Sequence, residues 1–273
     1  MRTDTRGWTL RRARTLAGAI DILRSEPGTV PLAGCTDVYV ALEFGGRPGT
    51  RFLDLSPLKA LHRITLKDDM LSIGALATFT EVQASRLVRQ RLPMLVEAAR
   101  LVGGIQIQNR GSIGGNIANG SPAGDSLPVL AAADAVVVLH GPEGDRRVPF
   151  TNFYTGYRTS VRRADELIVA VEVPPVQGRQ WFRKVGTRAA QAISKVVFAG
   201  VRAAAPRLAL GSVAATVVRL PRTEAALAAG QPLESALGLL AGEIAPIDDV
   251  RSTAAYRREV AANLVRQFWD ATA

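Results

Sequence analysis

The sequence contains little cysteine, histidine or aromatic residue. Its 273 residues include one cysteine, Cys35, and two histidines, His62 and His140. A single cysteine excludes an internal disulfide, a CxxC redox pair and an iron–sulfur cluster held by this chain. The histidines lie 78 residues apart, which argues against a histidine-based metal site. Aromatic residues make up 5% of the chain, which is few for stacking on single-stranded nucleic acid.

Long apolar runs are also missing. Runs such as 135–139 are much shorter than the roughly 20 residues that cross a bilayer. The N-terminal segment is rich in arginine but has no apolar stretch like that of a secretory signal. A transit peptide stays an alternative, although an amphipathic helix pattern begins directly after this segment. We therefore expect a soluble, cytoplasmic protein with no membrane span.

The composition that remains is that of a globular, basic protein. Hydrophobic residues make up 47% and charged residues 21% of the chain, so a large buried core is available. At about 150 residues per domain, the length suggests two domains. The net charge is +10, and only four of the 34 basic residues are lysine. A positive net charge is compatible with three kinds of binding partner: nucleic acid, an acidic ligand or an acidic protein surface.

Hydrophobic spacing predicts strands and helices in an α+β order. A helix is predicted over 15–24, with Thr15 as its cap, and others start at the capping box 78–81 and at Pro93. The apolar segment 167–173 predicts a strand buried on both faces. The remaining predicted strands are 29–33, 51–55, 70–75, 135–140, 182–185, 194–201, 207–213 and 216–219, and three helices follow at 223–229, 233–241 and 253–269. Strands before helices favour α+β over a doubly wound βαβ sheet, and 174–178 is the best linker candidate.

A glycine- and amide-rich segment at 103–125, expected as a loop, is the first candidate for function. Its centre, Gly111–Asn116, predicts a close backbone approach and a nest of N–H groups for an anion. Ser112, Asn116 and Asn119 add side-chain donors, and Asp125 could accept hydrogen bonds from sugar hydroxyls. The spacing fits neither GxGxxG nor GxxxxGK[ST]. A phosphate-containing ligand and a purely structural glycine turn both stay open.

A second small-residue loop, Gly34–Asp37, follows the predicted strand 29–33. Taken alone, this loop is best interpreted as an ordinary turn. Two such loops in one chain could instead clamp a pyrophosphate from both sides.

The two loops resemble those of a known family. Pro31–Asp37 (PLAGCTD) is similar to the first flavin loop, usually AGGTD or AGGHS, of the FAD-binding medium subunit of molybdenum hydroxylases such as xanthine and carbon monoxide dehydrogenases. Arg110–Asn119 (RGSIGGNIAN) resembles the second loop, and Ser121–Asp125 continues the match. Residues 183–188 with 192–194 resemble the segment that crosses the flavin. Asp249–Thr253 followed by Tyr256-Arg257 resembles the closing helix signature, so the resemblance runs from Trp8 to the last helix.

The resemblance implies a fold and a division into domains. The expected fold is a vanillyl-alcohol-oxidase/PCMH-type FAD-binding domain over 1–175, made of subdomains 1–56 and 57–175. A C-terminal α+β domain of the medium-subunit type is expected over 176–273.

The resemblance also implies FAD contacts by position, with no catalytic residue and no metal ligand on this chain. The first loop would bind the pyrophosphate through backbone N–H groups, and its residues are Pro31, Leu32, Ala33, Gly34, Cys35, Thr36, Asp37 and Val38. The second loop would hold the phosphates and the ribityl chain, and its residues are Gly111, Ser112, Gly114, Gly115, Asn116, Asn119 and Ser121. Beyond the loops, Asp125 would bind the adenosine ribose and the Ile168 backbone would contact the adenine side. Lys184 would hydrogen-bond the isoalloxazine edge, and Ile193 would pack near that ring. Val102 would line the flavin or adenine pocket.

One position departs from the family pattern. The second glycine of AGGTD is Cys35 here, and a non-glycine residue is strained wherever φ must be positive. Two interpretations of the thiol are open, a small packed side chain and a redox-sensitive group beside the flavin.

By resemblance, the chain is an electron-transfer flavoprotein. A molybdopterin-binding large subunit would oxidise the substrate, and a small subunit with [2Fe-2S] clusters would pass electrons to FAD on this chain. The external acceptor would be NAD, a quinone, another carrier or oxygen. The alternatives are a self-sufficient FAD-dependent oxidase or dehydrogenase acting on a small molecule, and a binding protein with a degenerate flavin site or affinity for nucleic acid.

Overall fold

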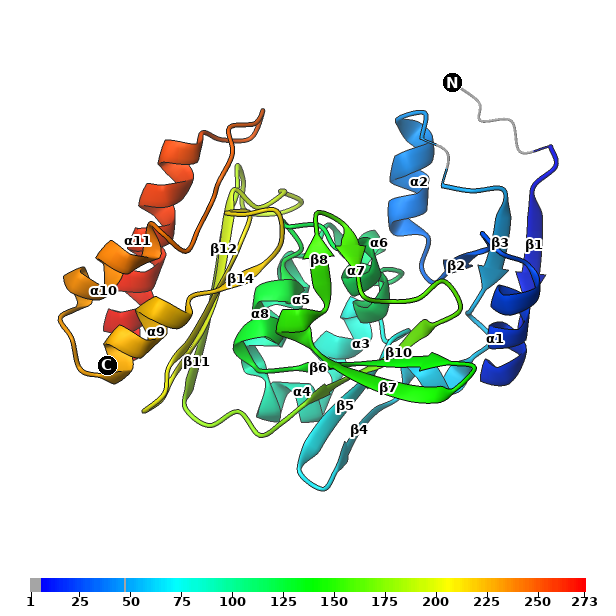
Figure 1. Cartoon of the computed structure of the whole chain (residues 1–273), viewed down its shortest axis with the longest axis horizontal. Coiled ribbons are helices and arrows are strands. Elements are labelled where there is room, and N and C mark those ends of the chain that lie inside the picture. The colour runs from blue at the N-terminus through cyan, green and yellow to red at the C-terminus, as the bar shows by residue number, and fades with distance from the viewer. Residues whose placement is uncertain (1–5, 47) are drawn as a thin grey trace.

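The N-terminal unit is a small parallel sheet with two helices. The structure, a computed structural model, describes residues 6–46 and 48–273. Strands β1 (Thr9–Arg12), β2 (Val30–Leu32) and β3 (Arg51–Asp54) pair in the order β1-β3-β2, and both pairs are parallel (Figure 1). Helices α1 (Leu16–Ser25) and α2 (Thr36–Glu43) connect them, and Thr15 caps α1 as predicted. This unit is therefore a βαβαβ arrangement, which the strand-then-helix order of the whole chain does not reveal.

The middle unit is built on a five-stranded antiparallel sheet. Its order is β4 (Ile64–Lys67), β5 (Met70–Gly74), β10 (Leu167–Val173), β6 (Val136–Gly141) and β7 (Gly144–Pro149). The short elements around it are η1 (Lys59–His62), α3 (Phe79–Ala84), α4 (Arg86–Arg91), α5 (Pro93–Leu101), α6 (Ile105–Gln108), α7 (Ile113–Asn119), α8 (Ser126–Ala132), η2 (Phe150–Asn152), β8 (Tyr154–Gly156) and β9 (Thr159–Ser160). The predicted capping box of Thr78 and Glu81 opens α3, and Pro93 opens α5, as expected.

Strand β10 is the centre of this sheet and is covered on both sides, as its apolar sequence predicts. Ile168, Val171 and Val173 face the main apolar cluster, which includes the helices of the middle unit. Leu167 and Val169 face a second cluster that is shared with α1 and β3. The N-terminal unit therefore packs, through shared apolar side chains, on the face of the middle sheet opposite the main apolar cluster.

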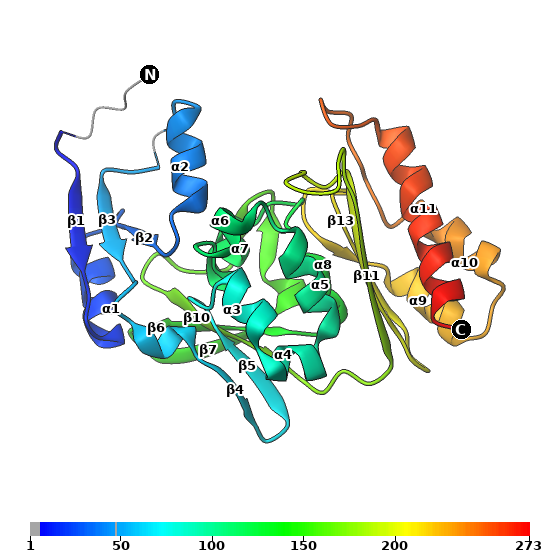
Figure 2. The same ribbon diagram turned by 180° about the vertical axis from the view of Figure 1, so that it is seen from behind.

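The C-terminal unit is a second antiparallel sheet backed by three helices. Strands β11 (Arg179–Val185), β12 (Val196–Arg202), β13 (Arg207–Gly211) and β14 (Val218–Arg219) pair in sequence order. Helices α9 (Pro221–Ala228), α10 (Leu233–Leu240) and α11 (Ala254–Ala271) lie on its outer side (Figure 2).

Strand β12 binds the C-terminal unit to the middle unit. Val197, Ala199 and Val201 belong to the main cluster, next to α8, whereas Val196 and Phe198 belong to the cluster under α11. Alternate side chains of a strand point to opposite faces, so an apolar residue is needed at each of these positions. The sheet is thus the middle layer of a sandwich between α5 and α8 on one side and α9–α11 on the other.

The structure corrects the expectation of a continuous loop at 103–125. This segment contains the two short helices α6 and α7. Ser112 is the N-cap of α7 and its hydroxyl accepts the N–H of Gly115, while Gly120 ends the helix with φ 58°. Helix formation overrides the high glycine content because α7 is packed and capped at both ends.

Many of the arginines form ion pairs within the chain. Arg146 pairs with Glu166 and Arg147 with Glu172, while Arg219 contacts both Asp134 and Glu224. Arg11 and Arg12, on the exposed strand β1, pair with Glu26 and Asp54.

Among the described residues, no helix is both long and apolar enough to span a membrane.

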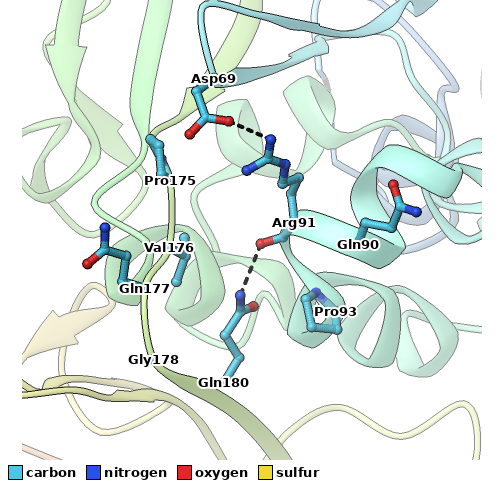
Figure 3. A pocket seen from close by; sticks show the side chains of 9 residues that line it. All are labelled: Asp69, Gln90, Arg91, Pro93, Pro175, Val176, Gln177, Gly178 and Gln180. Carbon is cyan, nitrogen blue, oxygen red and sulfur yellow. Dashed lines mark hydrogen bonds and ion pairs between the residues drawn. The ribbon is translucent and has the colours of Figure 1, made fainter.

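A cavity of about 480 Å³ lies beside the segment that connects β10 to β11, and Figure 3 shows its lining. Asp69 and Arg91 form an ion pair there, and the amide of Gln180 donates to the Arg91 carbonyl over 3.0 Å. The lining residues come from the β4–β5 turn, the α4–α5 junction, the segment between β10 and β11, and the start of β11: Asp69, Gln90, Arg91, Pro93, Pro175, Val176, Gln177, Gly178 and Gln180. This cavity therefore involves a different set of residues from the predicted FAD contacts.

The aromatic cluster around Phe198 gives a test of the sandwich. Phe198 is fully buried, and its ring centroid lies 5.5 Å from that of Trp181 and 5.3 Å from that of Phe268. We predict that Phe198→Ala lowers the free energy of unfolding by about 3–5 kcal/mol, measured by urea denaturation, because it leaves a cavity beneath α11. Phe44→Ala is the control, since Phe44 is 85% exposed; equal losses in the two variants would contradict the packing.

Candidate FAD-binding site

The two predicted loops lie in direct contact. A Cβ atom added to Gly34 would lie 1.7 Å from the carbonyl oxygen of Arg110 and 3.1 Å from the nitrogen of Gly111. Only a residue without a side chain can bring the two backbones this close. Gly34 is therefore needed for its small size. The two loops, from segments more than 70 residues apart, form one joined backbone unit, which we call the cradle.

Helix α2 begins directly after this contact. Cys35 is its N-cap, with φ 63° and ψ 7°, and the helix starts at Thr36. The first N–H groups of an α-helix have no carbonyl partner within the helix, so Thr36, Asp37 and Val38 direct theirs out of this end. The positive end of the helix dipole lies at the same place. This end of α2 thus has the chemistry expected of a pyrophosphate site.

Cys35 occupies the left-handed conformation that its glycine counterpart adopts without strain. Its φ of 63° costs about 1 kcal/mol for a non-glycine residue. Partial burial raises the pKa of the thiol, and the charge of Arg110 opposes that effect. The thiol is therefore protonated at neutral pH, and this state favours the packed side chain over a reactive group.

Two asparagine side chains of α7 connect this helix to α2 and to α8. The Asn119 amide donates to the Asp37 carboxylate over 2.9 Å, which joins the end of α7 to the start of α2. The Asn116 side-chain oxygen accepts the hydroxyl of Ser126 over 2.8 Å, in the first turn of α8. The contacts place Asn116 and Asn119 along one side of α7, between α2 and α8.

The expected nest of N–H groups in the second loop is not formed. The N–H of Ile113 donates to the Ala77 carbonyl and that of Gly114 to the Ala75 carbonyl, over 3.0 and 2.8 Å. The N–H of Gly115 donates to the hydroxyl of Ser112. A Cβ on Gly114 would also lie 2.6 Å from that of Ala75. Gly114 therefore has a structural role, and the side chains of this loop are its available polar groups.

A buried ion pair lies where the middle and C-terminal units meet. Lys184 Nζ lies 2.6 Å from Asp125 Oδ2, and each side chain is 7% exposed. The ammonium group also donates to the carbonyl of Leu101 over 2.8 Å, and the Ser194 hydroxyl donates to Asp125 Oδ1. Burial raises the pKa of Asp125, while Lys184 and the hydrogen bond from Ser194 oppose the rise. Lysine has three N–H donors, and these two contacts use two of them.

This pair bears on the roles that the resemblance implies. Asp125 was expected at the adenosine ribose and Lys184 at the isoalloxazine edge. Charged groups 2.6 Å apart cannot serve opposite ends of an extended FAD. The two expected roles therefore exclude each other.

The other predicted residues lie at different depths. Ile193 is 55% exposed on the segment between β11 and β12, and Gln191 of that segment lies next to Gly104. Val102 is half-buried immediately after Leu101, the carbonyl partner of Lys184. Ile168 is buried in β10 beside a β-bulge. Four further predicted residues, Pro31, Leu32 and Ala33 at the end of β2 and Ser121 after α7, are half-buried.

Two groups of this site were missed by sequence reasoning. Ser194 contacts Asp125 directly, and its position next to Ile193 in the flavin-crossing segment is a signal that could have identified it. The Leu101 carbonyl fixes Lys184 from 83 residues away, and a main-chain acceptor has no sequence signal.

Comparisons with known proteins identify the family of the chain. Residues 6–176 match the model of the FAD binding domain in molybdopterin dehydrogenase, and residues 180–272 match that of the CO dehydrogenase flavoprotein C-terminal domain. The chain belongs to this FAD-binding family. The matches cover nearly the whole chain and confirm the resemblance and the fold class predicted from the sequence.

Individual relatives are medium chains and FAD-binding subunits. The glyceraldehyde dehydrogenase medium chain of Sulfolobus acidocaldarius is 30% identical over 91% of this chain and 92% of its own. The xanthine dehydrogenase FAD-binding subunit of Escherichia coli O157:H7 is 38% identical, but the match covers 60% of this chain and 56% of that protein. The chain thus spans about half the length of that relative.

Solved structures agree with the fold. The structure of carbon monoxide dehydrogenase from Hydrogenophaga pseudoflava, in a form lacking the Mo-pyranopterin moiety, superposes with a TM-score of 0.90 and 27% identity. The superposition covers 97% of this chain and 96% of that one.

The contact at Gly34 and the strain at Cys35 predict different effects for substitutions at these neighbouring positions. Gly34→Ala should separate the loops, because its Cβ would overlap the Arg110 carbonyl, and should lower the melting temperature. Cys35→Gly should raise or maintain it, because glycine relieves the strain at φ 63°. Calorimetry of both variants checks this; a Gly34→Ala protein as stable as the wild type would contradict the contact.

The buried pair predicts a rescue. Lys184→Met should lower the free energy of unfolding by about 3–5 kcal/mol, because it leaves the Asp125 carboxylate buried without its cation. Adding Asp125→Asn should recover most of the loss, since no charge then remains. Urea denaturation of the two single variants and the double variant measures the coupling; strictly additive losses would contradict the pair.

Proposed function

We propose that the chain binds FAD along the edge that joins α2, α7 and the interface of α8 with the C-terminal sheet. Figure 1 shows α2, α6 and α7 following one another along one edge of the molecule. The observation that carries the proposal is the close contact of Gly34 with Arg110, which builds a cradle at the N-terminal end of α2. The hydrogen bond between Asn116 and Ser126 connects the second loop to the start of α8, where Asp125 pairs with Lys184.

Within this site, the pyrophosphate would lie at the N–H groups of Thr36, Asp37 and Val38. Their donors and the helix dipole favour a doubly charged group. Ser112, Asn116, Asn119 and Ser121 would hold the ribityl chain and the remaining phosphate oxygens.

Lys184 would hold positive charge at the isoalloxazine end. The Leu101 carbonyl and Asp125 fix its ammonium group, and the remaining N–H would point at the ring. Asp125 would orient Lys184. This role replaces the contact between Asp125 and the adenosine ribose that the resemblance implies. Ile193 and Val102 would supply apolar surface beside the ring, and the Ile168 backbone would lie toward the adenine. The bound flavin supplies the redox chemistry, and the chain supplies its position and its electrostatic environment.

The chain would then act as the electron-transfer subunit of a molybdopterin-dependent hydroxylase or dehydrogenase. Its partners would be a molybdopterin-binding large subunit and a [2Fe-2S] small subunit, and its acceptor would be NAD, a quinone, another carrier or oxygen. The relatives support this role over the self-sufficient oxidase, because they are named as medium chains or FAD-binding subunits of dehydrogenases.

FAD loading of the purified full chain tests the proposal. We expect FAD to bind with a shift of the visible flavin bands, and Gly34→Ala to reduce the bound fraction at least tenfold, because its Cβ breaks up the cradle. Phe44→Ala is the control, since Phe44 is exposed at the other end of α2. A wild-type chain that does not bind FAD would overturn the proposal.

A second measurement separates the two enzyme classes. Steady oxidation of small substrates by the FAD-loaded chain alone would favour the self-sufficient oxidase. We expect no such turnover until the partner subunits are added.

A further inference from the structure

The closing signature of the sequence, 249–257, is connected to the proposed flavin end through buried polar groups. It contributes Arg257 from the first turns of α11, and this arginine side chain is 4% exposed. Its Nη1 donates to the carbonyl of Lys195 over 3.0 Å and to that of Ser212 over 2.7 Å. One guanidinium group therefore fixes the backbone at two neighbouring loops.

Those two loops lead directly to the buried ion pair. Lys195 follows Ser194, whose hydroxyl donates to Asp125. The hydroxyl of Ser212 donates to the Ser194 carbonyl over 3.0 Å, and its N–H donates to the Pro122 carbonyl over 2.8 Å. The connection thus runs from Arg257 through Ser212 and Ser194 to Asp125.

The conformation of Ser212 shows that this connection is tightly constrained. Its φ is 64°, in the left-handed region that favours glycine. Such a residue persists where the surrounding bonds over-determine it, as its three hydrogen bonds do here.

The rest of the signature holds Arg257 in place. Asp249 Oδ1 accepts Arg257 Nη2 over 2.7 Å, and the same carboxylate accepts the backbone N–H groups of Arg251 and Ser252. Tyr256 adds a second attachment to the same loop, because Lys195 Nζ lies 5.0 Å from the centre of its ring.

Attachment of α11 does not by itself explain a buried arginine. Ala261, Leu264 and Phe268 already pack α11 against the sheet. A buried charge is costly, and an apolar residue of similar size is often as stable. The Arg257 Nε is buried without a hydrogen-bond partner among the described residues, which adds to that cost. The charge is therefore explained better by the two carbonyl groups that it orients.

We propose that Arg257 is a positioning residue for the flavin. By fixing the backbone at Lys195 and Ser212, it holds Ser194 against Asp125, and Asp125 in turn holds Lys184 at the isoalloxazine end. This inference rests on the proposed FAD site, and it assigns a role to the closing signature.

The test compares Arg257→Gln, Ser194→Ala and the double variant in the full chain. FAD titration of FAD-free protein gives the dissociation constant, and redox titration gives the midpoint potential. We expect each single variant to weaken FAD binding about tenfold, as for loss of a hydrogen bond to a charged group. We also expect a more negative potential, because Lys184 moves from the ring. The double variant should resemble the single variants, since both interrupt one connection.

Arg266→Gln is the matched control, because Arg266 lies on the same helix and pairs with Glu234 at the surface. It should leave both flavin measurements unchanged. If Arg257→Gln does not fold, Arg257→Lys replaces it, with the same expectation because lysine lacks the planar fork.

The outcomes separate this inference from the proposed function. A lower melting temperature with unchanged FAD affinity and potential would show a merely structural role and overturn the inference. Multiplied losses of about a hundredfold in the double variant would also overturn it. A wild-type chain that does not bind FAD would overturn the proposed function and this inference together.

Discussion

The arrangement of the molecule depends on the burial of β12 on both faces. Val197 and Ala199 pack toward α8, while Val196 and Phe198 pack toward α11. The middle and C-terminal units therefore both contribute to the main apolar cluster. This packing also builds the polar site, because Asp125 precedes α8, Lys184 lies on β11 and Ser194 lies two residues before the start of β12. Docking the helix on the sheet brings these three groups together.

Two different constraints shape the ends of the proposed FAD site. At the α2 end the constraint is steric, since the contact of Gly34 with Arg110 leaves no room for a side chain. At the α8 end it is electrostatic, since Asp125 and Lys184 are buried and each requires the other. A helix end with free N–H groups suits a pyrophosphate, and a fixed cation suits a ring that gains electrons. The site is therefore one of positioning and charge, which is what an electron-transfer flavoprotein requires.

Much of the fold could be predicted from local pattern. Thr15, Thr78 with Glu81, and Pro93 mark helix starts because caps act within a single turn. The apolar run 167–173 predicts a central strand, since both of its faces must be covered. Strand β1 and helices α6 and α7 were not predicted. All four residues of β1 are exposed, and the glycines of α7 conceal a helix that is stabilised by its contacts with Ala75 and Ala77.

The sequence by itself determined the family, and it located the two small-residue loops and the polar residues proposed to hold the dinucleotide, because these are short segments with characteristic spacing. Only the tertiary structure decided which of these residues meet. It showed that the N–H groups at Ile113 and Gly114 are already bonded, that Asp125 and Lys184 form one pair, and that Arg257 is linked to that pair. Contacts between residues 59 to 83 positions apart, such as those of Lys184 with Asp125 and Leu101, arise from the packing of helices on sheets. Local sequence spacing carries no record of that packing, because burial is a property of the whole fold.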